Sequence, residues 1–139
     1  MPEPLPHVSY YAERDFARAA AIDQTALGKD NYQTALIDSD LGEAYRQEKQ
    51  FSRALATLSE SVKTLQATLP AGAFNTAIAQ RSLGRTLLAL HNNRDAELQL
   101  SQAYSVFKTQ EHPSTADLEE IRRDLASAHA SAIESQKTR

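Results

Sequence analysis

Four histidines are the residues with the most obvious capacity to bind a metal ion or to transfer protons. They are His7, His91, His112 and His129. They lie in separate segments, and none belongs to a His-Glu-x-x-His motif that would place two ligands on one helix face. We expect His91 and His112 to lie in solvated turns. His129 falls at an apolar position of the repeat described below and is expected to be partly buried. The histidines therefore predict no metal site.

Neighbouring carboxylates could act as general acid and base only if they converged in a pocket. Asp38 with Asp40, and Glu119 with Glu120, are close in the sequence. Residues one or two positions apart point to different sides of a helix, so we expect both pairs to be solvated. Cysteine is absent, the four glycines are too dispersed for a phosphate-binding loop, and no Gly-x-Ser-x-Gly motif occurs. The sequence predicts no catalytic residue, no cofactor and no enzyme activity.

Three arginines offer another chemistry, the binding of carboxylates. Arg81 and Arg85 are four residues apart and share a helix face, and Arg123 repeats Arg81 one period later. Guanidinium groups bind carboxylates in a bidentate manner, so three arginines on one surface would favour an acidic ligand. The alternative is that they are solvated surface residues, some of them paired with nearby acids such as Glu43 or Glu120.

An internal repeat of 42 residues decides where these side chains would lie. The shift superposes Leu41-Gly42 on Leu83-Gly84 and then on Leu125-Ala126. Three further matches follow it: Ala54 with Ala96, Leu58 with Leu100, and Ser61 with Ala103. Glycine inside a helix costs about 0.5–1 kcal/mol relative to alanine. Its recurrence at one place in both units predicts a close approach of two helices there.

Apolar residues recur every three to four positions within each unit, which is typical of amphipathic helices. Proline, glycine and asparagine mark the breaks between them. We expect helices at 9–27, 31–48, 51–69, 73–91, 93–109 and 114–134. Paired as hairpins, they form a half repeat (9–27), two repeats (31–69 and 73–109) and a terminal helix (114–134), between a flexible proline-rich segment (1–8) and a polar tail (135–139). The expected fold class is all-α.

The pattern Leu-Gly-x-x-Tyr/Leu followed by Ala-x-x-x-Leu-x-x-small resembles the tetratricopeptide repeat. It is carried by Leu41, Gly42, Tyr45, Ala54, Leu58 and Ser61, and again by Leu83, Gly84, Leu87, Ala96, Leu100 and Ala103. The usual unit has about 34 residues. The longer spacing here is similar to the repeats of kinesin light chains and of the carboxyl-terminal regions of bacterial signalling proteins.

The resemblance implies antiparallel helical hairpins stacked as a right-handed superhelix, whose first helices line a concave groove that binds peptides or proteins. The register places ten residues at this groove: Ser39, Glu43, Arg46, Gln47, Ile78, Arg81, Arg85, Leu88, Arg123 and Ser127. The implied function is that of an adaptor or scaffold within a larger signalling protein. An acidic segment is one candidate ligand.

A second hypothesis is self-association through the half repeat at 9–27. This helix lacks a hairpin partner, which would leave an apolar face including Phe16 and Ile22 uncovered and available for a homodimer.

Composition narrows the remaining partners and the location. The chain has 15 basic and 18 acidic residues, a net charge of −3, which argues against nucleic-acid binding. No apolar stretch approaches the roughly 18 residues of a membrane helix, and the N-terminus lacks a signal-peptide pattern. We expect a cytoplasmic protein without membrane or nucleic-acid partners.

Overall fold

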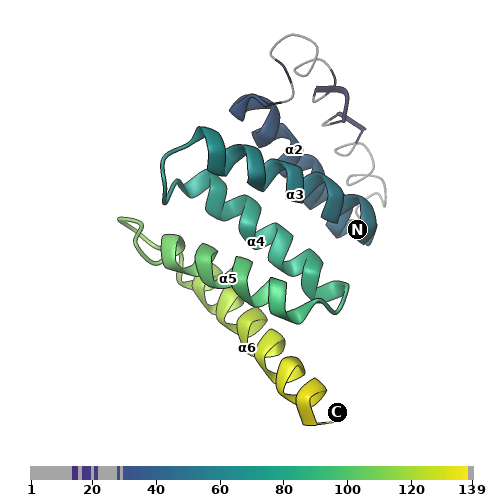
Figure 1. Ribbon diagram of the computed structural model, residues 1–139. Helices are drawn as coiled ribbons and strands as arrows, with labels where there is room; N and C mark the ends of the chain where they lie inside the picture. Colours follow the sequence, from purple (N-terminus) through teal and green to yellow (C-terminus); the bar gives the residue numbers. More distant parts are fainter. Residues whose placement is uncertain (1–13, 16, 20, 22–27, 29, 138–139) are drawn as a thin grey trace, which may run out of the picture. The chain divides into compact units, whose positions relative to one another are not determined.

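Five helices dominate the computed structural model, which describes residues 14–15, 17–19, 21, 28 and 30–137 (Figure 1). They are α2 (Tyr32–Gln47), α3 (Phe51–Thr68), α4 (Phe74–Ala89), α5 (Asn93–Phe107) and α6 (Thr115–Lys137). The described residues contain no strand, so the predicted all-α class is confirmed. Most of the expected helix at 9–27, and all of segment 1–8, lie outside the described residues, although 14, 15, 17–19 and 21 are helical.

The expected helix bounds are close to the observed ones, with one correction at the carboxyl end. Helix α6 continues to Lys137, so residues 135–137 are helical and do not belong to a polar tail. Polar Ser135 and Gln136 were read as the end of the helix, but neither residue is a helix breaker in the manner of glycine or proline.

The chain divides into two compact units, Met1–Pro70 and Ala71–Arg139. The boundary falls in the loop between α3 and α4, where Pro70 and Gly72 interrupt helical structure. In the first unit α2 packs against α3; in the second, α5 packs against both α4 and α6. This packing of consecutive helices is that of the predicted hairpin repeat, whereas the right-handed superhelix stays a prediction. No helix within the described residues has the length and apolar content needed to cross a membrane.

The core of each unit is built from equivalent positions of the repeat. Leu58 and Leu65 of α3 and Leu100 of α5 are fully buried, as is Ile121 of α6. The small residues that match across the repeat are buried as well: Ala54, Ser61, Ala96 and Ala103. Large and small side chains therefore alternate along the same stripe of α3 and α5.

Gly42 and Gly84 bring two pairs of helices close together, as the repeat predicts. A Cβ atom at Gly42 would lie 2.7 Å from Cδ2 of Leu58, and one at Gly84 would lie 2.8 Å from Cδ2 of Leu100. Both leucines are 0% exposed, so neither can easily move aside. Ala126, the third member of the series, is exposed.

The two hairpins α2–α3 and α4–α5 turn in the same way. Lys49 and His91 each adopt a positive φ, 62° and 61°, at positions 42 residues apart. In the first turn the amides of Lys49 and Gln50 donate to the carbonyls of Arg46 and Tyr45, both at 2.9 Å. His91 and Asn92 repeat this pattern with Leu88 and Leu87, at 3.0 and 2.9 Å. Both turns are Schellman motifs, in which a left-handed residue closes the helix end.

Candidate partner-binding face

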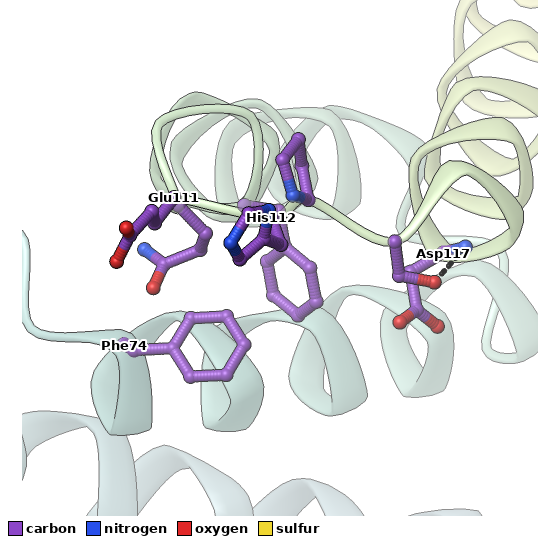
Figure 2. A pocket seen from close by; sticks show the side chains of 8 residues that line it. Phe74, Glu111, His112 and Asp117 are labelled. Carbon is purple, nitrogen blue, oxygen red and sulfur yellow. Dashed lines mark hydrogen bonds between the residues drawn. The ribbon is translucent and has the colours of Figure 1, made fainter.

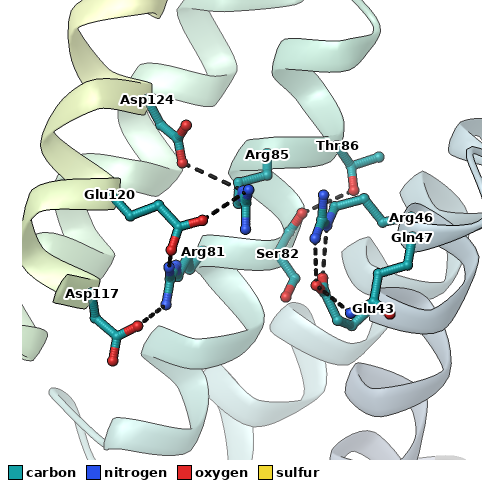
Figure 3. Close-up of polar contacts among 10 residues, drawn as sticks. All are labelled: Glu43, Arg46, Gln47, Arg81, Ser82, Arg85, Thr86, Asp117, Glu120 and Asp124. Atoms are coloured by element: carbon teal, nitrogen blue, oxygen red, sulfur yellow. Dashed lines mark hydrogen bonds and ion pairs between the residues drawn. The ribbon is translucent and has the colours of Figure 1, made fainter. Parts of the chain in front are cut away.

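Five charged side chains of α4 and α6 form an ion-pair cluster (Figure 3). Arg81 donates from Nη1 to Oδ1 of Asp117 at 2.9 Å and from Nη2 to Oε2 of Glu120 at 2.6 Å. Nη2 of Arg85 lies 3.0 Å from Oε1 of Glu120, and its Nε lies 3.4 Å from Oδ2 of Asp124. We call these five residues the α4–α6 cluster. It ties together two helices that otherwise touch little, because both pack mainly on α5.

The helical repeat explains why these side chains meet. Arg81 and Glu120 are 39 residues apart, three fewer than the repeat length, and three residues are about one helical turn. Arg85 and Asp124 have the same separation, so the two arginines and their acids run along facing stripes. With two positive and three negative groups, the cluster carries a formal charge of −1.

Arg81 is the most enclosed member of the cluster, with only 16% of its side chain exposed. Its guanidinium also lies 5.6 Å from the ring centroid of Phe107. The hydrogen bond from Arg81, with help from one made by Ser114, holds the pKa of Asp117 below its usual value. Asp117 therefore stays ionised through the neutral and mildly acidic range.

Two of the arginines predicted to bind an acidic ligand, Arg81 and Arg85, are thus already paired with carboxylates of α6. The alternative reading, in which some pair with nearby acids such as Glu120, is confirmed for Arg81 and Arg85. Arg123 is exposed, lies outside the cluster and has no ion pair among the residues described. The structure consequently does not gather three unpaired arginines on one surface.

The other predicted groove residues are distributed between the two units. In α2, Arg46 holds Glu43 in a bidentate ion pair at 2.8 and 2.6 Å, and Gln47 donates to the same carboxylate at 3.4 Å. Ser39 is buried and does not offer its hydroxyl to a partner.

In the second unit, the remaining predicted groove residues differ in exposure. Ile78 is 38% exposed, Leu88 is half-buried, and Ser127 is exposed. Ile78 is therefore the apolar groove residue that offers the most surface to a partner.

Next to the cluster, the loop between α5 and α6 borders an open hollow of about 330 Å³ (Figure 2). It is lined by Phe74, Phe107, Gln110, Glu111, His112, Pro113, Ser114 and Asp117. The two phenylalanine rings pack with centroids 4.9 Å apart; Phe107 is buried, whereas Phe74 is 40% exposed. We call this the loop hollow. Sequence reasoning missed it, because the sequence of residues 110–113 predicts a connection between helices but not which side chains pack around it.

The exposure of the histidines agrees with the prediction at two positions and differs from it at a third. His91 and His112 are exposed, as predicted. The prediction that His129 is partly buried is wrong: its side chain is 66% exposed, with Nδ1 3.8 Å from Oε1 of Glu97. Leu87, one period earlier, is buried, whereas in the second unit α6 packs on α4 and α5 with His129 on its exposed side. No group of three potential ligands within the described part of the chain could hold a metal ion.

Asp38 was expected to be solvated, but its side chain is partly buried. Burial, and then the nearby Glu60 carboxylate, raise the pKa of Asp38 above its ordinary value. The charged form is thus disfavoured in the folded chain, so ionised Asp38 lowers stability at neutral pH. Asp38→Asn is expected to raise the free energy of unfolding at about pH 7 by a few tenths of a kcal/mol, a small amount because solvent screens this half-exposed group.

The gain from Asp38→Asn should vanish below about pH 3.9, where the carboxyl is protonated in both the folded and the unfolded chain. Urea denaturation near pH 7 and near pH 3 measures the difference. Glu119→Gln, which removes a charge at an exposed position of α6, is the matched control. A gain of the same size at both pH values would contradict the prediction.

No protein-family model matches this chain. No curated protein matches it either. The resemblance to tetratricopeptide repeats therefore rests on the residues of the repeat and on the hairpins they form.

Proposed function

We propose that the chain is a non-catalytic protein-interaction module, an adaptor of the tetratricopeptide type that binds a peptide or protein partner on its second unit. The binding face consists of the loop hollow, the exposed side of α4 and the α4–α6 cluster. We further propose that the module acts in the cytoplasm as part of a signalling assembly, in keeping with the proteins whose repeats it resembles.

One observation carries this proposal: two large apolar side chains stand exposed on successive turns of α4. Phe74 and Ile78 are four residues apart and 40% and 38% exposed, so they share one face of the helix. Phe74 also borders the loop hollow. Exposed apolar groups beside a concave, polar-rimmed site are characteristic of protein-binding surfaces.

The α4–α6 cluster supports the proposal by holding α4 and α6 together beside the loop hollow. Two of its ion pairs join Arg81 to α6, and two more join Arg85 to the same helix. A surface held in one arrangement before binding loses less conformational freedom when a partner docks. The cluster is thus better suited to positioning the face than to capturing an acidic ligand by itself.

Affinity capture from a lysate of the source cells tests the proposal. Ile78→Asn is expected to reduce partner retention about tenfold, which corresponds to the loss of 1–2 kcal/mol of apolar burial. Leu98→Asn is the matched control, because Leu98 is 54% exposed on α5 and does not line the loop hollow. Both variants should keep the helical circular dichroism of the wild type.

Three outcomes of this capture experiment are informative. Loss of a partner with Ile78→Asn alone supports the α4 face. Equal loss with both variants would place the interaction elsewhere. Recovery of no partner by the wild-type chain would favour self-association through the half repeat at 9–27, whose residues Phe16 and Ile22 lie outside the described part of the chain.

A further inference from the structure

We infer that the partner places a basic side chain, arginine or lysine, in the loop hollow, against the ring of Phe74 and the carboxylate of Glu111. This inference rests on the proposed function and names the chemistry of the partner. The inferred side chain has the opposite charge to the acidic ligand that the three arginines suggested.

Charge is the first argument. Two carboxylates, Glu111 and Asp117, line the loop hollow, and its described lining contains no lysine or arginine. Glu111 is exposed and makes no ion pair among the described residues. Asp117 is paired with Arg81, so the carboxylate of Glu111 is the charge of the lining that a partner would meet. A basic side chain would meet an excess of negative charge, and an acidic one would be repelled.

The aromatic wall is the second argument. A cation within about 6 Å of an aromatic ring centroid is attracted to the face of the ring. Arg81 provides an example within the protein: it lies 5.6 Å from the centroid of Phe107 while it donates to Asp117. Phe74 and Glu111, both of which line the loop hollow, offer the same pair of groups, a ring and a carboxylate (Figure 2). A basic side chain from the partner would reproduce the internal contact.

The size of the loop hollow is the third argument. A volume of about 330 Å³ is at the small end of the range for ligand sites, which suits one long side chain better than a large ligand. Arginine and lysine bury their aliphatic stems against apolar surface while the charged head remains near water and carboxylates. Phe74 and Pro113 supply that apolar surface.

A nuclear magnetic resonance titration of the ¹⁵N-labelled chain tests the inference. The probes are the peptides acetyl-Ala-Leu-Arg-Leu-Ala-amide and acetyl-Ala-Leu-Glu-Leu-Ala-amide. The arginine peptide is expected to shift the amide resonances of Phe74, Glu111 and His112, with saturation at millimolar concentration. The glutamate peptide is expected to leave them unchanged. Equal shifts with both peptides, larger shifts with glutamate, or no shift with either would overturn the inference.

Glu111→Gln should weaken binding of the arginine peptide about two- to fivefold, the range for an exposed ion pair. The control Glu119→Gln removes the same charge from an exposed position of α6 outside the loop hollow and should leave the affinity unchanged. Equal weakening by both variants would show only a long-range charge effect and would reject the site.

The two proposals fail separately. If Ile78→Asn abolishes capture of the partner while the arginine peptide leaves the loop hollow unperturbed, the interaction module stands and the basic side chain is rejected. If the arginine peptide binds but Ile78→Asn has no effect on capture, the basic-side-chain site in the loop hollow stands and the exposed side of α4 is rejected as part of the binding face.

Discussion

Gly84→Ala is expected to lower the free energy of unfolding by up to about 2 kcal/mol, although alanine is the better helix former. The added Cβ would lie 2.8 Å from Cδ2 of Leu100, a fully buried side chain that has no free space to enter. Overpacking of a core contact costs about 1–3 kcal/mol. Replacing glycine by alanine gains only about 0.8–1 kcal/mol in helix propensity, which is less than most of the overpacking range. Urea denaturation followed by circular dichroism measures the net change.

The repeat supplies two comparisons for Gly84→Ala. Gly42→Ala, at the equivalent position of the first unit, should be destabilising for the same reason, through Leu58. Ala126→Gly is the control at the third position, where the residue is exposed, and should cost only about 0.5–1 kcal/mol through lost propensity. An increase in stability with Gly84→Ala would show that the α4–α5 contact tolerates a methyl group.

Arg81→Glu is expected to lower the free energy of unfolding by about 2–4 kcal/mol. The range lies somewhat below that for breaking a fully buried ion pair, because the partner acids are 40% exposed. The substitution removes two ion pairs and the contact with Phe107, and it places a third carboxylate beside Asp117 and Glu120. Urea denaturation gives the global effect, and hydrogen exchange should show faster opening of α6.

Arg123→Glu is the matched control for Arg81→Glu, since it makes the same change at an exposed arginine with no ion pair among the described residues. Its effect should stay within about 0.5 kcal/mol. Combining Arg81→Glu with Glu120→Arg should restore part of the loss, because it re-forms one opposite-charge pair. Equal effects of Arg81→Glu and Arg123→Glu would mean that the cluster contributes nothing to stability.

The fold could be predicted because local and long-range signals agree. Gly42 and Gly84 contradict helix propensity at the same place in both units, and the close contacts with Leu58 and Leu100 explain why. Proline or glycine marks the breaks on either side of the second hairpin, so its bounds could be placed within two residues. The end of α6 could not be placed as well, since the sequence up to Lys137 contains no proline or glycine that would mark it.

The candidate site was predicted less well, because it depends on which side chains meet across helices. Arg81 and Arg85 were correctly placed on one face, but the sequence left open whether α6 or a ligand supplies their carboxylates. A separation of 39 residues, three short of the repeat, was the available signal for Glu120 and Asp124. His129 was misjudged because register alone does not say whether another helix covers that position. The loop hollow needs the packing of Phe74 on Phe107, which links distant segments.

The matching turns at Lys49 and His91 have a consequence for recognising further repeats of this kind. Each turn is closed by backbone hydrogen bonds and one left-handed residue, so its length is fixed while most of its side chains can vary. A fixed length holds each glycine sixteen positions before the leucine that packs on it, at 42 and 58 and again at 84 and 100. Searches of other genomes for this hairpin should therefore score that interval between a small residue and a leucine, and within the turn should penalise only β-branched residues at the left-handed position.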